Sequence, residues 1–155
     1  MNIIIDGNDG VGKTTLAKLL QKEFKIKSYI HLSAKDPRDF GFYYNILLKN
    51  DAIFDRSFMD EDIYSRVLER KCELSDTEQL ILHHAVTATK AIVIICHTDS
   101  KGYDLGEDER ILKHHRMIDD YFKNLADKYS YIYFDPHKDS YEALVNTIYI
   151  KESLL

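Results

Sequence analysis

The sequence predicts an α/β fold in three layers, with a five-stranded parallel sheet flanked by helices. Short β-branched and apolar runs alternate along the chain with longer stretches in which apolar residues recur at helical spacing. The runs predict strands near 2–6, 28–33, 51–55, 91–97 and 130–135. The stretches predict helices near 13–25, 38–49, 58–71, 75–89, 107–128 and 139–151. Strands separated by helices form a parallel sheet that is covered on both faces, with right-handed crossovers.

Length and composition indicate one ordinary globular domain over residues 1–155. The net charge of −5 argues against non-specific nucleic-acid binding. There is no apolar stretch of about 18 residues, so no membrane span is expected, and the N-terminus does not read as a signal peptide. Cys72 and Cys96 lack the spacing of a metal or redox motif, which favours a reducing compartment such as the cytoplasm.

The loop between the first strand and the first helix matches the phosphate-binding pattern G-x-x-x-x-G-K-[ST] at every fixed position. In such a loop, main-chain N–H groups and a helix N-terminus point at one anion. We expect Lys13 to reach the β- and γ-phosphates of ATP and the Thr14 hydroxyl to coordinate Mg2+. A chance glycine-rich turn is disfavoured by the flanking strand and helix, so the fold is predicted to be a P-loop NTPase fold. The predicted nucleotide-binding residues are Gly7, Asn8, Asp9, Gly10, Val11, Gly12, Lys13, Thr14 and Thr15.

Ligands of such sheets bind at the carboxyl ends of the strands, so the residues just after each strand are candidates. The third predicted strand ends in Asp55 and Arg56. Asp55 is suited to hold Mg2+ directly or through water, or to take a proton from an acceptor hydroxyl. Arg56 offers a planar fork for a phosphate group. The alternative interpretation is a surface ion pair at the end of a strand.

The second predicted strand is followed by Lys35, Asp36 and Arg38. These charges suit an acceptor that carries a phosphate, or an acceptor hydroxyl that needs a base, and a polar turn explains them equally well. Of the aromatic residues that come next, most are expected in the core. One or two of them, with Phe42 and Tyr43 as candidates, are left to stack on a nucleobase.

Residues 99–110 are predicted to form a short lid, because they combine two glycines with alternating charges. Lys101 or Arg110 would then stabilise charge that develops on the transferring group. A solvated loop accounts for the same composition.

These positions together resemble the thymidylate kinase family of P-loop nucleoside monophosphate kinases. Residues 6–15 are similar to that family's [ED]-G-x-[DE]-G-x-G-K-T-T, and residues 35–37 fall where the family has Arg-Glu-Pro. Asp55 and Arg56 match its Asp-Arg motif, and Tyr64 lies nine residues after Asp55, as the family's tyrosine does. The resemblance covers nearly the whole chain, in order.

The resemblance implies Mg-ATP-dependent phosphoryl transfer to a deoxynucleoside monophosphate, dTMP or a near relative. It implies that Asp9 holds the sugar hydroxyl of the acceptor, that Arg56 binds its phosphate and that Asp55 serves Mg2+ or water. Lys35 would stand where the family has a phosphate-facing arginine, and a lysine cannot form the two parallel hydrogen bonds of a guanidinium group. Small-molecule nucleotides are the implied partners, and analogy with the family suggests a homodimer.

Two alternatives stay open. The chain is short for the family and lacks an arginine-rich lid, while Gly7-Asn8 and Asp55-Arg56-Ser57 look like the corresponding segments of deoxynucleoside kinases. In that interpretation the acceptor is a 5′-hydroxyl and Asp36 becomes the candidate base. The second alternative is a nucleotide-binding regulatory protein without catalytic activity.

Overall fold

The computed structural model describes residues 1–98 and 109–154. Its strands are β1 (Asn2–Gly7), β2 (Ser28–His31), β3 (Ala52–Asp55), β4 (Ile92–Cys96) and β5 (Ile132–Phe134). Its longer helices are α1 (Lys13–Glu23), α2 (Phe40–Leu47), α4 (Asp76–Ala88), α6 (His115–Tyr129) and α7 (Tyr141–Leu154). The shorter ones are the 3-10 turn η1 (Phe58–Asp60), α3 (Glu61–Val67) and α5 (Glu109–Lys113).

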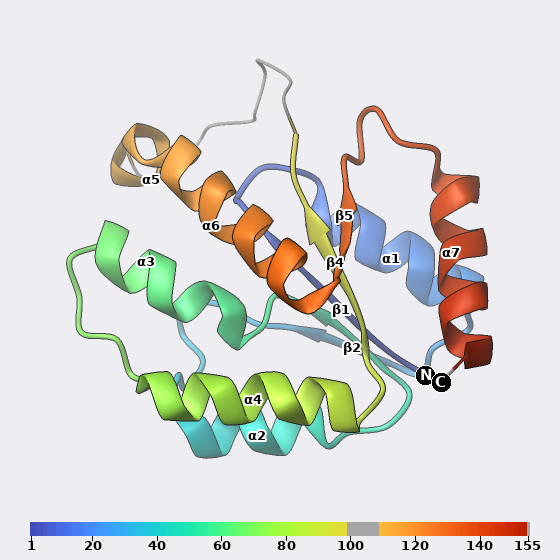
Figure 1. Ribbon diagram of the computed structural model, residues 1–155, viewed down its shortest axis with the longest axis horizontal. Coiled ribbons are helices and arrows are strands. Elements are labelled where there is room, and N and C mark those ends of the chain that lie inside the picture. The colour runs from blue at the N-terminus through green and yellow to red at the C-terminus, as the bar shows by residue number, and fades with distance from the viewer. Residues whose placement is uncertain (99–108, 155) are drawn as a thin grey trace.

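The five strands form one parallel sheet in the order β2-β3-β1-β4-β5. Helices α1 and α7 cover one face of the sheet, and α2, α3, α4 and α6 cover the other (Figure 1). The predicted three-layer α/β fold is therefore confirmed. Because every strand runs in the same direction, the carboxyl ends of all five lie at one edge, where β1 continues into the glycine loop.

The hydrophobic core has two parts because side chains alternate along each strand. On β1, Ile4 faces the helices α2, α3, α4 and α6, whereas Ile3 and Ile5 face α1 and α7. All three are completely buried. Continuous β-branched runs are typical of a parallel sheet that is covered on both faces.

Two predicted helices differ from the observed ones. The helix expected over 107–128 is divided, within its described part, into α5 and α6. The helix expected over 58–71 starts as the turn η1, whose N-cap Ser57 accepts a hydrogen bond from the Met59 N–H, and α3 ends at Val67. Glu69 then has a left-handed φ of 52°, which a continuing helix cannot contain.

The cap of α4 agrees with its sequence pattern. Ser75 Oγ accepts from the Glu78 N–H at 3.3 Å, and the Glu78 carboxylate accepts from the Ser75 N–H at 2.8 Å. This is the reciprocal arrangement that the S-x-x-E spacing predicts.

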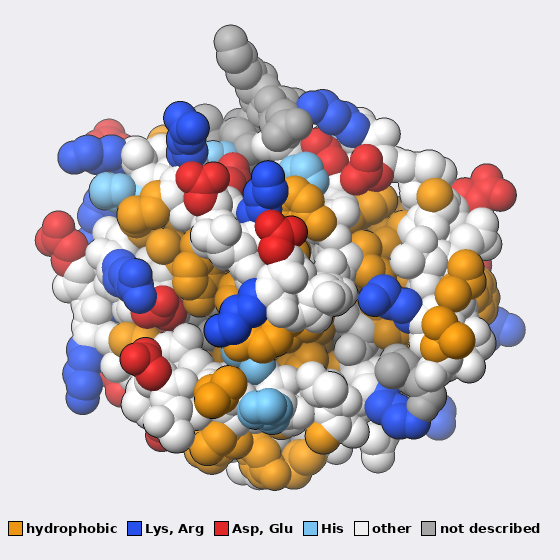
Figure 2. Space-filling model, viewed as in Figure 1, with side chains coloured by type: hydrophobic (Ala, Val, Ile, Leu, Met, Phe, Trp, Pro, Cys, Tyr) orange, Lys and Arg blue, Asp and Glu red, His pale blue; other side chains and the backbone are white. Residues whose placement is uncertain are grey.

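Charged side chains of both signs are scattered over the face shown in Figure 2, and hydrophobic side chains gather at its lower edge, over α2 and α4. The exposed apolar residues there are Tyr44 of α2, Leu48 directly after its end, and Leu80 and Ile81 of α4. Among the described helices, none has the length and apolar character needed to cross a membrane.

Candidate active site

The glycine loop turns sharply where β1 meets β4. Gly7 has a φ of 128° and lies opposite Cys96, and a Cβ atom built on Gly7 would lie 2.1 Å from the Cys96 carbonyl oxygen. Gly12, with a φ of 93°, is the N-cap of α1 and offers no side-chain oxygen to the first N–H groups of the helix. Those N–H groups are therefore available to a ligand, which is the property that suits a helix N-terminus to phosphate.

Lys13 lies against the loop that precedes it. Its Nζ donates to the main-chain oxygen of Gly7 at 2.9 Å and to that of Asn8, and it lies 3.6 Å from Asp9 Oδ1. The side chain is buried, and burial, followed by repulsion from Arg56, lowers its pKa. The ammonium group is thus poorly solvated and well placed to pair with an anion that enters the loop.

Asp55, at the end of β3, is the acceptor of three hydrogen bonds on a single oxygen. Its Oδ2 accepts from Thr14 Oγ1 at 2.6 Å, from the Tyr29 hydroxyl at 2.7 Å and from His31 Nδ1 at 2.8 Å. Burial alone would raise the pKa of Asp55, but these hydrogen bonds outweigh it and lower the pKa below its usual value. Asp55 is therefore ionised.

The other carboxylate oxygen of Asp55 fits the expected metal. Oδ1 is buried and has no hydrogen-bond partner among the described residues. Thr14 and Asp55 place a hydroxyl and a carboxylate side by side, and oxygen donors of this kind are the ligands that Mg2+ prefers. The residues present therefore fit a divalent cation that accompanies a nucleotide.

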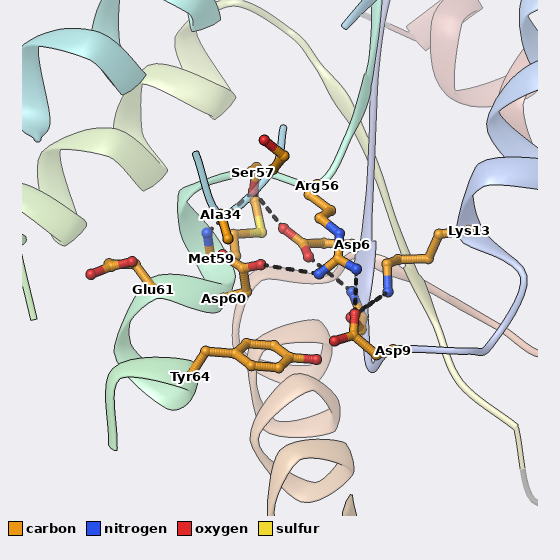
Figure 3. A network of polar contacts seen from close by, with 12 residues as sticks. Asp6, Asp9, Lys13, Ala34, Arg56, Ser57, Met59, Asp60, Glu61 and Tyr64 are labelled. Carbon is orange, nitrogen blue, oxygen red and sulfur yellow. Dashed lines mark hydrogen bonds and ion pairs between the residues drawn. The ribbon is translucent and has the colours of Figure 1, made fainter. Parts of the chain in front are cut away.

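Arg56 connects the end of β3 to the loop. Its guanidinium group forms an ion pair with Asp9 Oδ1 and lies 3.8 Å from Asp60 Oδ2, with the ring of Tyr64 alongside (Figure 3). Burial opposes the charge on Arg56, but the carboxylates of Asp9 and Asp60 outweigh it and raise its pKa. Arg56 also adopts a left-handed φ of 81°. Such strained backbone in a residue other than glycine is concentrated at functional sites.

Next to the contacts of Arg56, Asp6 and Ser57 form a buried pair. The Ser57 hydroxyl donates to Asp6 Oδ2 at 2.6 Å, and the Gly7 N–H donates to Asp6 Oδ1 at 3.0 Å. Burial raises the pKa of Asp6 to about 6. The pair ties the segment after β3 to the start of the glycine loop.

A cavity of about 310 Å³ opens beside Asp9 and Arg56, between the ends of β2 and β3 and the helix α3. Three guanidinium groups line it. Arg70 forms a two-bond pair with the buried carboxylate of Glu61 at 2.6 and 2.8 Å, and Arg38 lies 3.9 Å from the same carboxylate. Besides Asp9, Arg38, Arg56 and Arg70, the lining includes His31, Ser33, Tyr43, Asp60, Glu61 and Tyr64. The cavity therefore offers a second ligand aromatic surface and three guanidinium groups, each of which is paired with a carboxylate of the lining.

The residues predicted after β2 separate into two groups. Arg38 and the buried Tyr43 line the cavity, whereas Lys35 and Asp36 do not belong to its lining. Asp36 accepts from the Ser33 N–H at 2.7 Å and the Ser33 hydroxyl at 2.9 Å, which lowers its pKa. Asp36 therefore caps its own turn.

The remaining candidates lie farther out. Phe42 is only partly buried and packs against the core. Arg110, in α5, donates to the Leu68 carbonyl oxygen at 3.4 Å. Residues 99–108 of the predicted lid, including Lys101, lie outside the described residues.

Several residues at the site were not predicted from the sequence. Tyr29 and His31 of β2, and the pair between Glu61 of α3 and Arg70 beyond its end, belong to no motif, although polar residues that alternate on a strand are a weak signal for one shared face. Asn8, one of the predicted nucleotide-binding residues, is completely buried and donates to Asp119 Oδ1 of α6 at 3.0 Å, a contact that was not predicted. This contact joins residues that are far apart in the chain, so no local pattern announces it.

No protein-family model matches the chain, and no curated relative matches it. Among solved structures, the chain is similar to YorR protein from Bacillus subtilis in complex with phosphorylated GDP, at 21% identity and a TM-score of 0.79, over 99% of this chain and 96% of that one. It is also similar to deoxyadenosine kinase from M. mycoides. The structure with the products dCMP and a flexible dCDP matches with 18% identity and a TM-score of 0.54, over 99% and 98% of the two chains. The dATP complex matches with 18% identity and a TM-score of 0.51, over 99% and 100%. These likenesses show that the chain shares the fold of these nucleotide-binding proteins.

Proposed function

We propose that the chain transfers a phosphoryl group from Mg-ATP to a deoxynucleoside monophosphate, dTMP or a near relative. The observation that carries the proposal is the ion pair between Arg56 and Asp9. Asp9 belongs to the glycine loop, and both residues line the cavity that contains three guanidinium groups, which supports an acceptor site next to a phosphate-binding loop. A donor phosphate on the loop and an acceptor phosphate in the cavity would then meet beside Arg56.

The chemistry would depend on positioning and on charge stabilisation, without a covalent enzyme intermediate. The N–H groups at the start of α1 and the ammonium group of Lys13 would bind the β- and γ-phosphates of ATP. Thr14 and Asp55 would hold Mg2+, which supplies neutralisation of the negative charge on the transferring group. Arg56 would orient the phosphate of the acceptor so that its oxygen faces the donor.

The other side chains of the cavity would bind the rest of the acceptor. Tyr64 lies beside Arg56 and Asp9 and is proposed, with Asp9, to hold the sugar. Tyr43 lines the cavity whereas Phe42 packs against the core, so we assign the contact with the nucleobase to Tyr43 first. Arg38 would add positive charge near the acceptor phosphate.

Three further assignments stay predictions: Lys35 as a phosphate ligand, Arg110 as a lid cation, and assembly of the chain as a homodimer. The extent of the domain, taken as the whole of 1–155, is also a prediction.

A deoxynucleoside kinase is the second candidate, in which the acceptor is a 5′-hydroxyl. The observation in its favour is the similarity to deoxyadenosine kinase over nearly the full length of both chains. Asp36 is the candidate base for that reaction in the sequence, but its carboxylate accepts two hydrogen bonds from Ser33 in the same turn. Binding of nucleotides without catalysis is the third candidate.

One assay separates the three. Protein and Mg-ATP are mixed with each member of a panel of deoxynucleosides and their monophosphates, and release of ADP is followed. Turnover with monophosphates alone supports the proposal, and turnover with nucleosides alone supports the second candidate. Measurable ATP binding without turnover on any acceptor would refute both enzymatic functions.

Replacement of Lys13 tests the donor side of the site. Lys13→Met keeps the length of the side chain but removes the charge that faces the loop. We expect kcat to fall by about 100-fold or more, on the scale of other groups that stabilise developing charge. A kcat close to that of the wild type would contradict the role assigned to Lys13.

A further inference from the structure

Two side chains of the edge strand β2 converge on the carboxylate at the end of β3. Tyr29 and His31 are two residues apart, so they lie on the same face of the strand, and His31 pairs in register with Asp55. The Tyr29 hydroxyl and His31 Nδ1 lie 2.7 and 2.8 Å from Asp55 Oδ2. An ionised carboxylate only accepts hydrogen bonds, so both groups donate to it.

This arrangement makes the two oxygens of Asp55 unequal. With the Thr14 hydroxyl at 2.6 Å, Oδ2 accepts three hydrogen bonds. Oδ1 is buried and has no hydrogen-bond partner among the residues that the structure describes. Leaving a charged oxygen buried and unpaired is unfavourable unless a cation or another donor meets it. Three donors on one oxygen fix the rotation of the carboxylate group and therefore the direction of the other oxygen.

The donors of β2 are not required to satisfy buried groups of their own. The His31 side chain is 46% exposed and Tyr29 is half-buried, so water is within reach of both. Their convergence on one oxygen of a buried carboxylate therefore serves the carboxylate of Asp55, and not a need of the two donors for a partner. Side chains that orient a metal ligand through hydrogen bonds commonly change metal affinity by about 10–100-fold when they are replaced.

We propose that Tyr29 and His31 are positioning residues that hold Oδ2 of Asp55 and thereby present Oδ1 to the divalent cation that accompanies the nucleotide. The inference rests on the proposed function, because that function brings a metal-bound nucleotide to Thr14 and Asp55. Neither residue is assigned a contact with ATP or with the metal, and His31 also lies in the lining of the acceptor cavity. Both act through Asp55.

The test separates metal affinity from nucleotide affinity. The variants are Tyr29→Phe, His31→Leu and the double variant, and His31→Asn is the matched control, because its side-chain amide can donate from the position of Nδ1. Binding of Mn2+ is measured by the electron paramagnetic resonance signal of free Mn2+, with a saturating non-hydrolysable ATP analogue. Affinity for the same analogue without metal is measured in the presence of a chelator.

We expect the double variant to bind Mn2+ about 10–100-fold more weakly than the wild type, with a smaller loss in each single variant. His31→Asn should restore most of the affinity that His31→Leu loses. Affinity for the analogue without metal should stay within about twofold of the wild type in every variant, because the loop and Lys13 are unchanged.

Two results would overturn the inference. One is a double variant that binds Mn2+ as tightly as the wild type. The other is a loss of metal-free affinity as large as the loss of Mn2+ affinity, which would mean that the two residues support the fold rather than the metal ligand. A wild-type protein that does not bind the analogue at all would instead refute the proposed function, so the two failures are distinguishable.

Discussion

Replacement of Gly7 by alanine tests how the glycine loop is built. Gly7 combines a φ of 128° with a place opposite Cys96, and the new Cβ would lie 2.1 Å from the Cys96 carbonyl oxygen. No side-chain rotation relieves that overlap, because the contact is with main-chain atoms, so β1 and β4 must separate. Backbone strain and overpacking together predict a loss of roughly 2–5 kcal/mol in the free energy of unfolding.

The assay is urea unfolding, combined with measurement of ATP affinity. Gly41→Ala in α2 is the matched control: its Cβ would meet the Asp39 side chain at 3.2 Å, and its stability should stay within about 1 kcal/mol of the wild type. Gly7→Ala should also weaken ATP binding, because the proposed phosphate-binding loop begins at Gly7. A Gly7→Ala variant as stable as the wild type, with normal ATP affinity, would refute the reasoning about close approach of the strands.

Three further predictions concern the polar network. Arg56→Lys keeps the charge but loses the planar fork that contacts Asp9, so we expect KM for the acceptor to rise by about 10-fold, with a smaller change in kcat, in steady-state kinetics. Equal KM values would contradict this role. Burial raises the pKa of Asp6 from 3.8 to about 6, so its contribution to stability is fully present below 3.8 and is lost as the pH rises through 6. Relative to Asp6→Asn, the wild type should lose on the order of 3 kcal/mol of unfolding free energy between about pH 4 and pH 7, and a pH-independent difference would exclude the effect. Asp119→Ala leaves the buried amide of Asn8 short of one acceptor, so chemical denaturation should show a loss of roughly 1–3 kcal/mol, and no loss would mean that the contact does not stabilise the loop.

The features that could be predicted from the sequence are those whose local structure is set by residues close together in the chain. The β-branched run at Ile3 to Ile5, the glycine loop after it and the S-x-x-E cap of α4 each follow from local patterns. The break between α5 and α6 has no such signal, because it falls at His114, without glycine or proline. The helical spacing continues through the break, so sequence predicts one helix.

At the site, sequence identified single residues better than it identified their partners. Ligands of parallel sheets bind at the carboxyl ends of the strands, and this rule selects Asp55 and Arg56 as candidates. Both residues do lie at the end of β3. The contacts of Asp55 with Tyr29 and His31 depend on the register between β2 and β3. That register is set by packing of the whole sheet rather than by any short pattern.

Transfer of a labelled γ-phosphate is the most direct test of the account. ATP labelled on its γ-phosphate is incubated with the protein, Mg2+ and a deoxynucleoside monophosphate, and the products are separated by chromatography. We expect the label to appear in the corresponding deoxynucleoside diphosphate, and to do so far more slowly with Lys13→Met. Label that stays in ATP, or that is released only as inorganic phosphate with every acceptor, would contradict the assignment of the arginine-lined cavity as an acceptor site.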